Sequence, residues 1–287
     1  MNMTAPRLAL DDITICAADC LNPGLAADAL MRSQRHCRFA DAILFTSATV
    51  HGDFRTMAIP PLVSRQAYSG FVLHRLADFI STEFVLIVQW DGYVVEPDAW
   101  SREFLDHDYI GAPWPWHDHH RVGNGGFSLR SRRLLHALAE IPDDCEIAED
   151  EAICRHWRPA LERRGINFAP ERLAARFSYE RGRPNEPSFG FHGMFNMWRH
   201  LGDQEMVHLV NTLDSRTIFC QEYVECFIEY HLQRRFAPLA ALYRRWTACM
   251  SGERIEEFLA RLIDDRALVR DSLAMAARAD AILKQVT

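Results

Sequence analysis

Three short apolar runs, separated by two helical patterns, are the feature that most constrains the fold of this chain. The runs are 12-DITICAA-18, 41-DAILFTSA-48 and 84-FVLIV-88. Between them, residues 22–37 and 68–79 carry apolar side chains at helical spacing. Strands that are apolar on both faces and alternate with helices are typical of a parallel sheet covered by helices. The sequence therefore predicts an α/β fold with a mostly parallel, Rossmann-type sheet, where ligands bind at the carboxyl ends of the strands.

The composition narrows the class of protein further. Of the 287 residues, 48% are hydrophobic and 25% are charged, which is enough apolar material for a sizeable core. The formal net charge of −7 gives no reason to expect a nucleic-acid partner. No C-x-x-C pair, no signal-peptide pattern and no apolar run near the roughly 18 residues of a membrane span is visible. We therefore expect a cytoplasmic protein with reduced thiols and no transmembrane segment.

The pattern of apolar residues in the sequence changes near residue 200. Residues 203–234 and 252–286 read as amphipathic helices, with apolar side chains gathered on one face. We therefore expect two regions. Residues 1–199 would form the sheet-containing domain. Residues 200–287 would form a helical C-terminal region that acts as a cap or supports homo-oligomerisation.

Polar residues follow the third apolar run directly, in 89-QWDG-92. A lone carboxylate behind a strand is often a turn cap. Here Gly92 allows the backbone to approach a ligand closely. A divalent cation bound together with a diphosphate needs only one or two protein carboxylates. Asp91 is therefore a candidate ligand for such a cation.

Two further segments combine small or acidic residues in ways that suit ligand binding. The segment 123-GNGGF-127 is either a tight turn into a strand or a loop that packs against a sugar or phosphate. The segment 149-EDE-151 is either a solvated first helical turn or, if it points into a cleft, a source of a general base.

Aromatic segments supply the remaining candidates. In 189-FGFHG-193, His192 is either a core histidine or a ligand of a metal or phosphate. In 112-APWPW-116, the two indoles either pack into the core or form a stacking platform for a sugar or base.

The order of these motifs resembles a bacterial family of glycosyltransferase-like domains that is catalogued as being of unknown function. The resemblance extends over residues 12–195, about two thirds of the chain. That family is similar to nucleotide-sugar transferases with a single Rossmann-like domain, the GT-A type. The motifs that carry the resemblance are 86-LIVQWDGYVVEPDAW-100, 108-DYIGAPW-114, 122-VGNGGFSLRSR-132, 149-EDE-151 and 188-SFGFHG-193.

The resemblance implies roles for particular residues. Asp91 and His192 would hold Mn²⁺ or Mg²⁺ on the donor diphosphate, and Glu149 or Asp150 would be the catalytic base. Gln89 replaces the first Asp of the Asp-x-Asp motif, so a weaker metal site is expected. The nucleotide would lie against Ala17, Ala18 and Asp19. The implied substrate-binding residues are Gln89, Trp90, Gly92, Trp114, Trp116, Asn124, Gly125, Gly126 and Phe127.

The expected function is transfer of a sugar from a nucleotide-sugar donor, UDP-linked, to a hydroxyl acceptor, with metal assistance and inversion. The acceptor would be a glycan, a lipid-linked molecule or a protein. Two alternatives stay open. One is a non-catalytic module that binds a sugar nucleotide or a glycan, and the other is a different nucleotide-dependent transferase.

Overall fold

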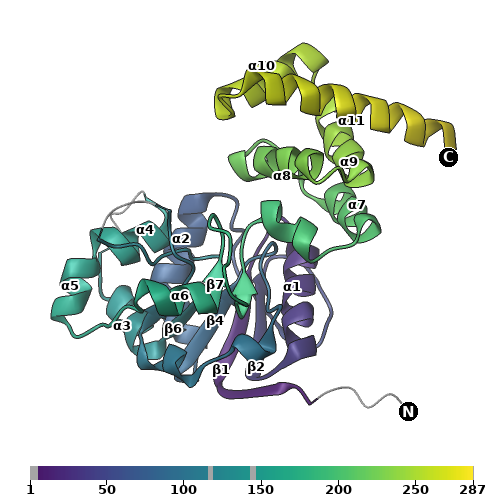
Figure 1. Cartoon of the computed structure of the whole chain (residues 1–287). Coiled ribbons are helices and arrows are strands. Elements are labelled where there is room, and N and C mark those ends of the chain that lie inside the picture. Colours follow the sequence, from purple (N-terminus) through teal and green to yellow (C-terminus); the bar gives the residue numbers. More distant parts are fainter. Residues whose placement is uncertain (1–5, 116–118, 143–146, 287) are drawn as a thin grey trace. The chain divides into compact units, whose positions relative to one another are not determined.

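The computed structural model describes residues 6–115, 119–142 and 147–286. The chain forms two compact units, Met1–His192 and Gly193–Thr287 (Figure 1). The sequence predicts a boundary between residues 199 and 200, whereas the units divide just behind His192. The short helix η5 (Met194–Arg199) packs on helix α8 and therefore belongs to the second unit.

A six-stranded sheet, in the order β3-β2-β1-β4-β6-β5, forms the centre of the first unit. Strand β1 pairs in parallel with β2 and with β4, and β2 pairs in parallel with β3. Strand β6 is antiparallel to both of its neighbours, so the other five strands share one direction. The predicted α/β fold with a mostly parallel sheet is confirmed. The strands are β1 (Leu8–Ala18), β2 (Cys37–Thr46), β3 (Arg55–Ala58), β4 (Phe84–Val88), β5 (Tyr109–Ile110) and β6 (Phe127–Ser131).

Helices flank this sheet. Helix α1 begins with proline at its first position, where no intrahelical amide is lost, and buries small residues against β1 and β2. Helix α2 begins where Ser64 Oγ accepts a hydrogen bond from the Ala67 amide, and its Phe71 ring lies 5.1 Å from the Phe45 ring. The helical elements are α1 (Pro23–His36), α2 (Arg65–His74), η1 (Leu76–Phe79), η2 (Pro97–Ala99), η3 (Arg102–Asp106), α3 (Arg132–Ala139), α4 (Glu149–Glu151), η4 (Ala152–His156), α5 (Arg158–Arg163) and α6 (Glu171–Phe177).

A two-stranded parallel sheet completes the first unit. It consists of β7 (Ser178–Tyr179) and β8 (Gly190–Phe191). The amide of Val95 donates to the carbonyl of Phe189, which ties the start of β8 to the chain that follows β4. Because Tyr179 pairs with Phe191, the residues that follow these two strands, Glu180 and His192, become neighbours.

The second unit is entirely helical in the residues that the structure describes, as the sequence predicts. Its core contains the fully buried Trp246, whose ring nitrogen donates to the Ile218 carbonyl and whose ring packs against Tyr223 and Phe227. None of the described helices of the chain combines the length and the apolarity that a membrane crossing requires. The helical elements are η5, α7 (Asp203–Thr212), η6 (Ser215–Thr217), α8 (Gln221–Leu232), α9 (Phe236–Thr247), α10 (Gly252–Leu262) and α11 (Arg266–Val286).

Candidate active site

The antiparallel strand β6 brings two predicted motifs together. Strand β4 ends at Val88, and Val88 pairs with Phe127, the first residue of β6. The amide of Gln89 then donates to the carbonyl of Gly126 over 2.8 Å. The segment that contains Asp91 and the glycine loop 123–126 therefore meet at the carboxyl end of β4, where ligands of such sheets bind.

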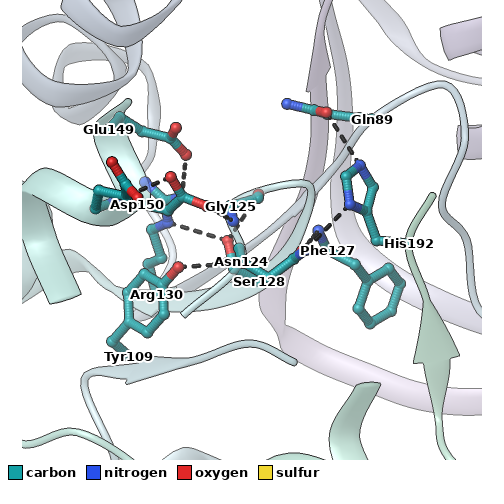
Figure 2. A network of polar contacts seen from close by, with 11 residues as sticks. Gln89, Tyr109, Asn124, Gly125, Phe127, Ser128, Arg130, Glu149, Asp150 and His192 are labelled. Atoms are coloured by element: carbon teal, nitrogen blue, oxygen red, sulfur yellow. Dashed lines mark hydrogen bonds and ion pairs between the residues drawn. The ribbon is translucent and has the colours of Figure 1, made fainter. Parts of the chain in front are cut away.

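His192 connects the residues at this edge (Figure 2). Its Nε2 lies 3.2 Å from Asp91 Oδ1 and 3.1 Å from Gln89 Oε1. Its Nδ1 lies 3.3 Å from Glu180 Oε1 and 3.1 Å from the amide nitrogen of Asn124. Burial opposes the charged imidazole, but the carboxylates of Asp91 and Glu180 outweigh it and raise the pKa of His192 well above its ordinary value. Asp91 and His192, both predicted as metal ligands, are thus in contact.

The glycine loop packs under side chains of the protein itself. Asn124 has a positive φ of 64°, which turns the chain sharply before β6. A Cβ atom on Gly126 would lie 2.1 Å from His192 Nε2, and one on Gly125 would lie 1.9 Å from Glu149 Oε1. The space over both glycines is therefore filled by the imidazole and by a carboxylate. The two glycines act in the site by admitting these groups.

We expect Gly126→Ala to displace the His192 imidazole from its position over the glycine loop. The added methyl group would overlap the imidazole, which is held on both sides by carboxylates. The overlap should destabilise the first unit by about 1–3 kcal/mol, measured by urea unfolding. Gly24→Ala is the matched control, since a Cβ there meets nothing within 4 Å. Equal stability of the two variants would contradict the packing described here.

On the other side of the loop, Glu149 is held by a buried arginine. Arg130 is fully buried, and its Nη2 donates to Glu149 Oε1 over 2.7 Å. Its Nε donates to Ser128 Oγ, which in turn donates to the carbonyl of Gly125. The guanidinium also lies over the ring of Tyr109, whose hydroxyl donates to the carbonyl of Asn124. The ion pair thus anchors the loop backbone.

Glu149, predicted as an alternative base, is engaged in this ion pair. Its side chain is 6% exposed, and the same oxygen that approaches Gly125 accepts from Arg130. Glu149 therefore holds the loop.

Asp150 has the environment of a base. Its Oδ2 accepts from the amide of Gly125 over 3.0 Å, and its Oδ1 accepts from the amide of Glu151. Burial, followed by the negative charge of Glu149, raises the pKa of Asp150 to about 7. The carboxyl is therefore poised to exchange a proton near neutral pH. Figure 2 shows Asp150 and His192 on opposite sides of the loop.

Three residues that were predicted to contact a substrate or nucleotide are buried. Trp114 is 5% exposed, and its indole covers Gly123 within a core cluster, so no broad face is left for stacking. Phe127 is fully buried against the rings of Phe177 and Phe189. Ala17 is fully buried in β1, so its side chain cannot contact a nucleotide. Phe127 and Ala17 belong to the core, whereas Trp114 belongs to a core cluster and also lines a neighbouring cavity.

The other predicted residues lie at or near the edge. Ala18, Asp19 and Trp90 are partly exposed at the ends of β1 and β4, and Asp19 Oδ1 accepts from the amides of residues 21 and 22. Gly92 has no room for a side chain, because a Cβ would lie 2.6 Å from the carbonyl oxygen of Phe191. Trp116 lies outside the described residues.

One member of the site was not predicted from the sequence. Glu180 contacts His192 Nδ1 and is mostly buried. Glu180 could have been predicted only from the pairing of β7 with β8, and each of these strands has only two residues. Among the described residues, no group of three or more histidines, cysteines, aspartates or glutamates has the geometry of a metal site.

Comparison with known proteins adds a family and a set of similar structures. Residues 53–192 match a family described as "Protein of unknown function (DUF5672)". No curated protein matches the sequence.

Several solved structures of glycosyltransferases are similar to this chain at low identity. One is a glycosyltransferase involved in glycosylation of the major capsid of PBCV-1, at 12% identity and a TM-score of 0.41, covering 63% of this chain and 91% of that one. Another is the mannosyltransferase PcManGT from Pyrobaculum calidifontis in complex with GDP-Man and Mn²⁺, at 15% identity and a TM-score of 0.41, covering 97% and 87%. A third is the glycosyltransferase GlyE of Streptococcus pneumoniae, at 12% identity and a TM-score of 0.40, covering 65% and 54%.

Proposed function

We propose that the chain is a glycosyltransferase, which moves a sugar from a UDP-linked donor to a hydroxyl group of an acceptor. One observation supports this most directly. The glycine loop separates an Asp91–His192 pair, suited to a diphosphate with its cation, from Asp150, suited to removing a proton. A glycosyltransferase needs one group that stabilises the leaving diphosphate and another that deprotonates the acceptor, separated by no more than about one sugar ring.

Asp91, Gln89 and His192, the last after loss of a proton from its ring, would hold a divalent cation, Mn²⁺ or Mg²⁺. Asp91 Oδ1 and Gln89 Oε1 lie 3.2 Å and 3.1 Å from His192 Nε2. Neighbouring ligands of an octahedral ion are about 3 Å apart, because each lies roughly 2.1 Å from the ion. His192 Nδ1 lies beside Glu180 Oε1, the carboxylate that typically orients a metal-binding imidazole through its other nitrogen. When bound, the cation would offset the charge of the departing diphosphate.

Asp150 would act on the acceptor. Its carboxylate takes the proton of the acceptor hydroxyl as that oxygen bonds to the anomeric carbon. The bond from this carbon to the diphosphate oxygen breaks at the same time, and the configuration is inverted. The backbone amide of Gly125 holds Asp150 Oδ2 in place, so the base is fixed relative to the loop that contacts His192.

We expect Asp91→Asn to weaken binding of a UDP-sugar in the presence of Mn²⁺ by about tenfold or more, the usual scale for losses in a metal site. An amide keeps the shape of the side chain but removes the carboxylate from the two oxygen ligands, Asp91 Oδ1 and Gln89 Oε1, that lie near His192 Nε2. Isothermal titration with and without Mn²⁺ measures this. Asp98→Asn, at an exposed position in η2, is the matched control.

The same titrations, followed by turnover assays, test the proposal against the alternatives. Donor binding that depends on Asp91, with product formed on an acceptor, supports a glycosyltransferase. Donor binding without turnover or donor hydrolysis on any donor would instead identify a binding module. Absence of binding by any nucleotide sugar would overturn the proposal.

A further inference from the structure

A cavity of about 490 Å³ lies beside the candidate active site, within the first unit. Its walls come from helix α6, from residues 178–186 and from two stretches around Trp114 and Arg121. Glu180 belongs to this wall and also contacts His192 Nδ1. The cavity therefore adjoins the donor side of the site. Its volume falls in the range of small-molecule binding pockets, roughly 300–1,000 Å³.

Arginine is the dominant charged residue of the wall. Four arginines and three glutamates line the cavity, and two of the glutamates are already engaged. Glu171 pairs with Arg121 over 2.9 Å, and Glu180 contacts His192. Arg176 pairs with Glu103 over 3.9 Å. The wall arginines outside these three contacts are Arg172 and Arg183, which share the wall with the single glutamate Glu186. The cavity is therefore positively charged towards a ligand.

The arginines are placed by secondary structure. Arg172 and Arg176 are four residues apart on α6, so both project from one face of that helix. Arg183 lies on the loop opposite, and both Arg172 and Arg183 are exposed. Guanidinium groups that line one cavity from two elements suit carboxylate and phosphate groups, which accept two parallel hydrogen bonds.

The remaining wall is apolar and rigid. Pro113, Pro184 and Ala175 contribute to it, together with the buried rings of Trp114 and Tyr179. Both rings are largely covered, at 5% and 6% exposure, so they offer edges to the cavity. A sugar ring presents patches of C–H groups that pack on such surfaces, while its charged substituent reaches the arginines.

We propose that this cavity binds an anionic saccharide, whose ring carries a carboxylate or a phosphate group. The inference rests on the cavity and its charged wall. It names a ligand class that the residues of the candidate active site leave open.

The test compares charged and neutral sugars on the full-length chain. The probes are methyl β-D-glucuronide, glucose 6-phosphate and the neutral methyl β-D-glucoside, titrated at low salt by NMR. We expect the anionic probes to bind at least tenfold more tightly than the neutral one, the scale of one charge-assisted contact. Arg172→Gln combined with Arg183→Gln should abolish this difference. Arg65→Gln combined with Arg163→Gln, both exposed and outside the cavity wall, should preserve it.

The outcomes separate this inference from the proposed function. Preference for only one of the two anionic probes would assign the carboxylate or the phosphate as the recognised group. Equal binding of charged and neutral probes, or a preference that survives loss of both arginines, would overturn the inference. The Asp91-dependent titration of a UDP-sugar runs in parallel. If that donor binds while the anionic preference is absent, the cavity assignment fails and the transferase proposal stands.

Discussion

Replacement of Asp150 by Asn is expected to lower the rate of sugar transfer by about 10²–10⁴-fold, the usual contribution of a general base. The amide keeps an oxygen that can accept from the Gly125 amide, so the loop should stay in place. It cannot take the proton of an acceptor hydroxyl. Donor affinity should therefore remain nearly unchanged. Single-turnover transfer and donor titration on the same preparation measure the two quantities separately.

The pH dependence of transfer provides a second check on Asp150. Its pKa is raised to about 7 because burial and the nearby Glu149 both disfavour the ionised form. A base acts only when ionised, so the rate should rise with pH through about 7 and level off above it. Glu151→Gln is the matched control, since Glu151 is exposed in the same helical turn.

Two outcomes would contradict this role. If Asp150→Asn lost donor binding together with transfer, the residue would be structural. If the rate of the unchanged protein were flat between pH 5 and 8, some other group would carry the proton. If Asp150→Asn kept its donor binding, and the rate of the unchanged protein fell as the pH dropped below about 7, Asp150 would be the base. Glu149 is held by Arg130.

The sheet and one part of the site could be predicted because their signals are local. Strands β1, β2 and β4 each contain a continuous apolar run, and the polar residues behind β4 stand at the edge where ligands bind. Asp91 could be assigned to this edge from that pattern, whereas only the family resemblance implied that His192 belongs beside it; the two side chains lie 3.2 Å apart. The glycine loop joined them because β6 runs antiparallel to β4 from Phe127 onward.

The rest of the site depends on pairings that the sequence does not display. Glu180 faces His192 through the register of two strands of two residues each, too short to produce a periodic pattern. Arg130 looks like a surface residue, since charged side chains are rarely buried without a partner. Its partner, Glu149, is nineteen positions away in the chain. Trp114 shows the opposite case, in which a loop aromatic packed into the core.

Replacement of Arg130 by Met should destabilise the first unit by about 3–5 kcal/mol, the usual cost of removing one partner from a buried ion pair. Glu149 would be left as a buried carboxylate without its guanidinium, and Ser128 Oγ would lose the Arg130 Nε donor. Urea unfolding measures the loss. Hydrogen exchange of the β4 and β6 amides assigns it to the first unit. Arg38→Met is the matched control, since its pair with Asp11 is exposed and worth roughly 0–1 kcal/mol.

The double variant Arg130→Met with Glu149→Leu separates charge from packing. Removing both charges should recover much of the stability, because well-packed apolar groups often replace a buried ion pair at little cost. Transfer should recover less, because the carbonyl of Gly125 is held through Ser128 and Arg130. If Arg130→Met were as stable as Arg38→Met, the Arg130–Glu149 pair would contribute nothing to the stability of the fold. A double variant with full stability and full transfer would show that the loop keeps Asp150 and His192 in register without it.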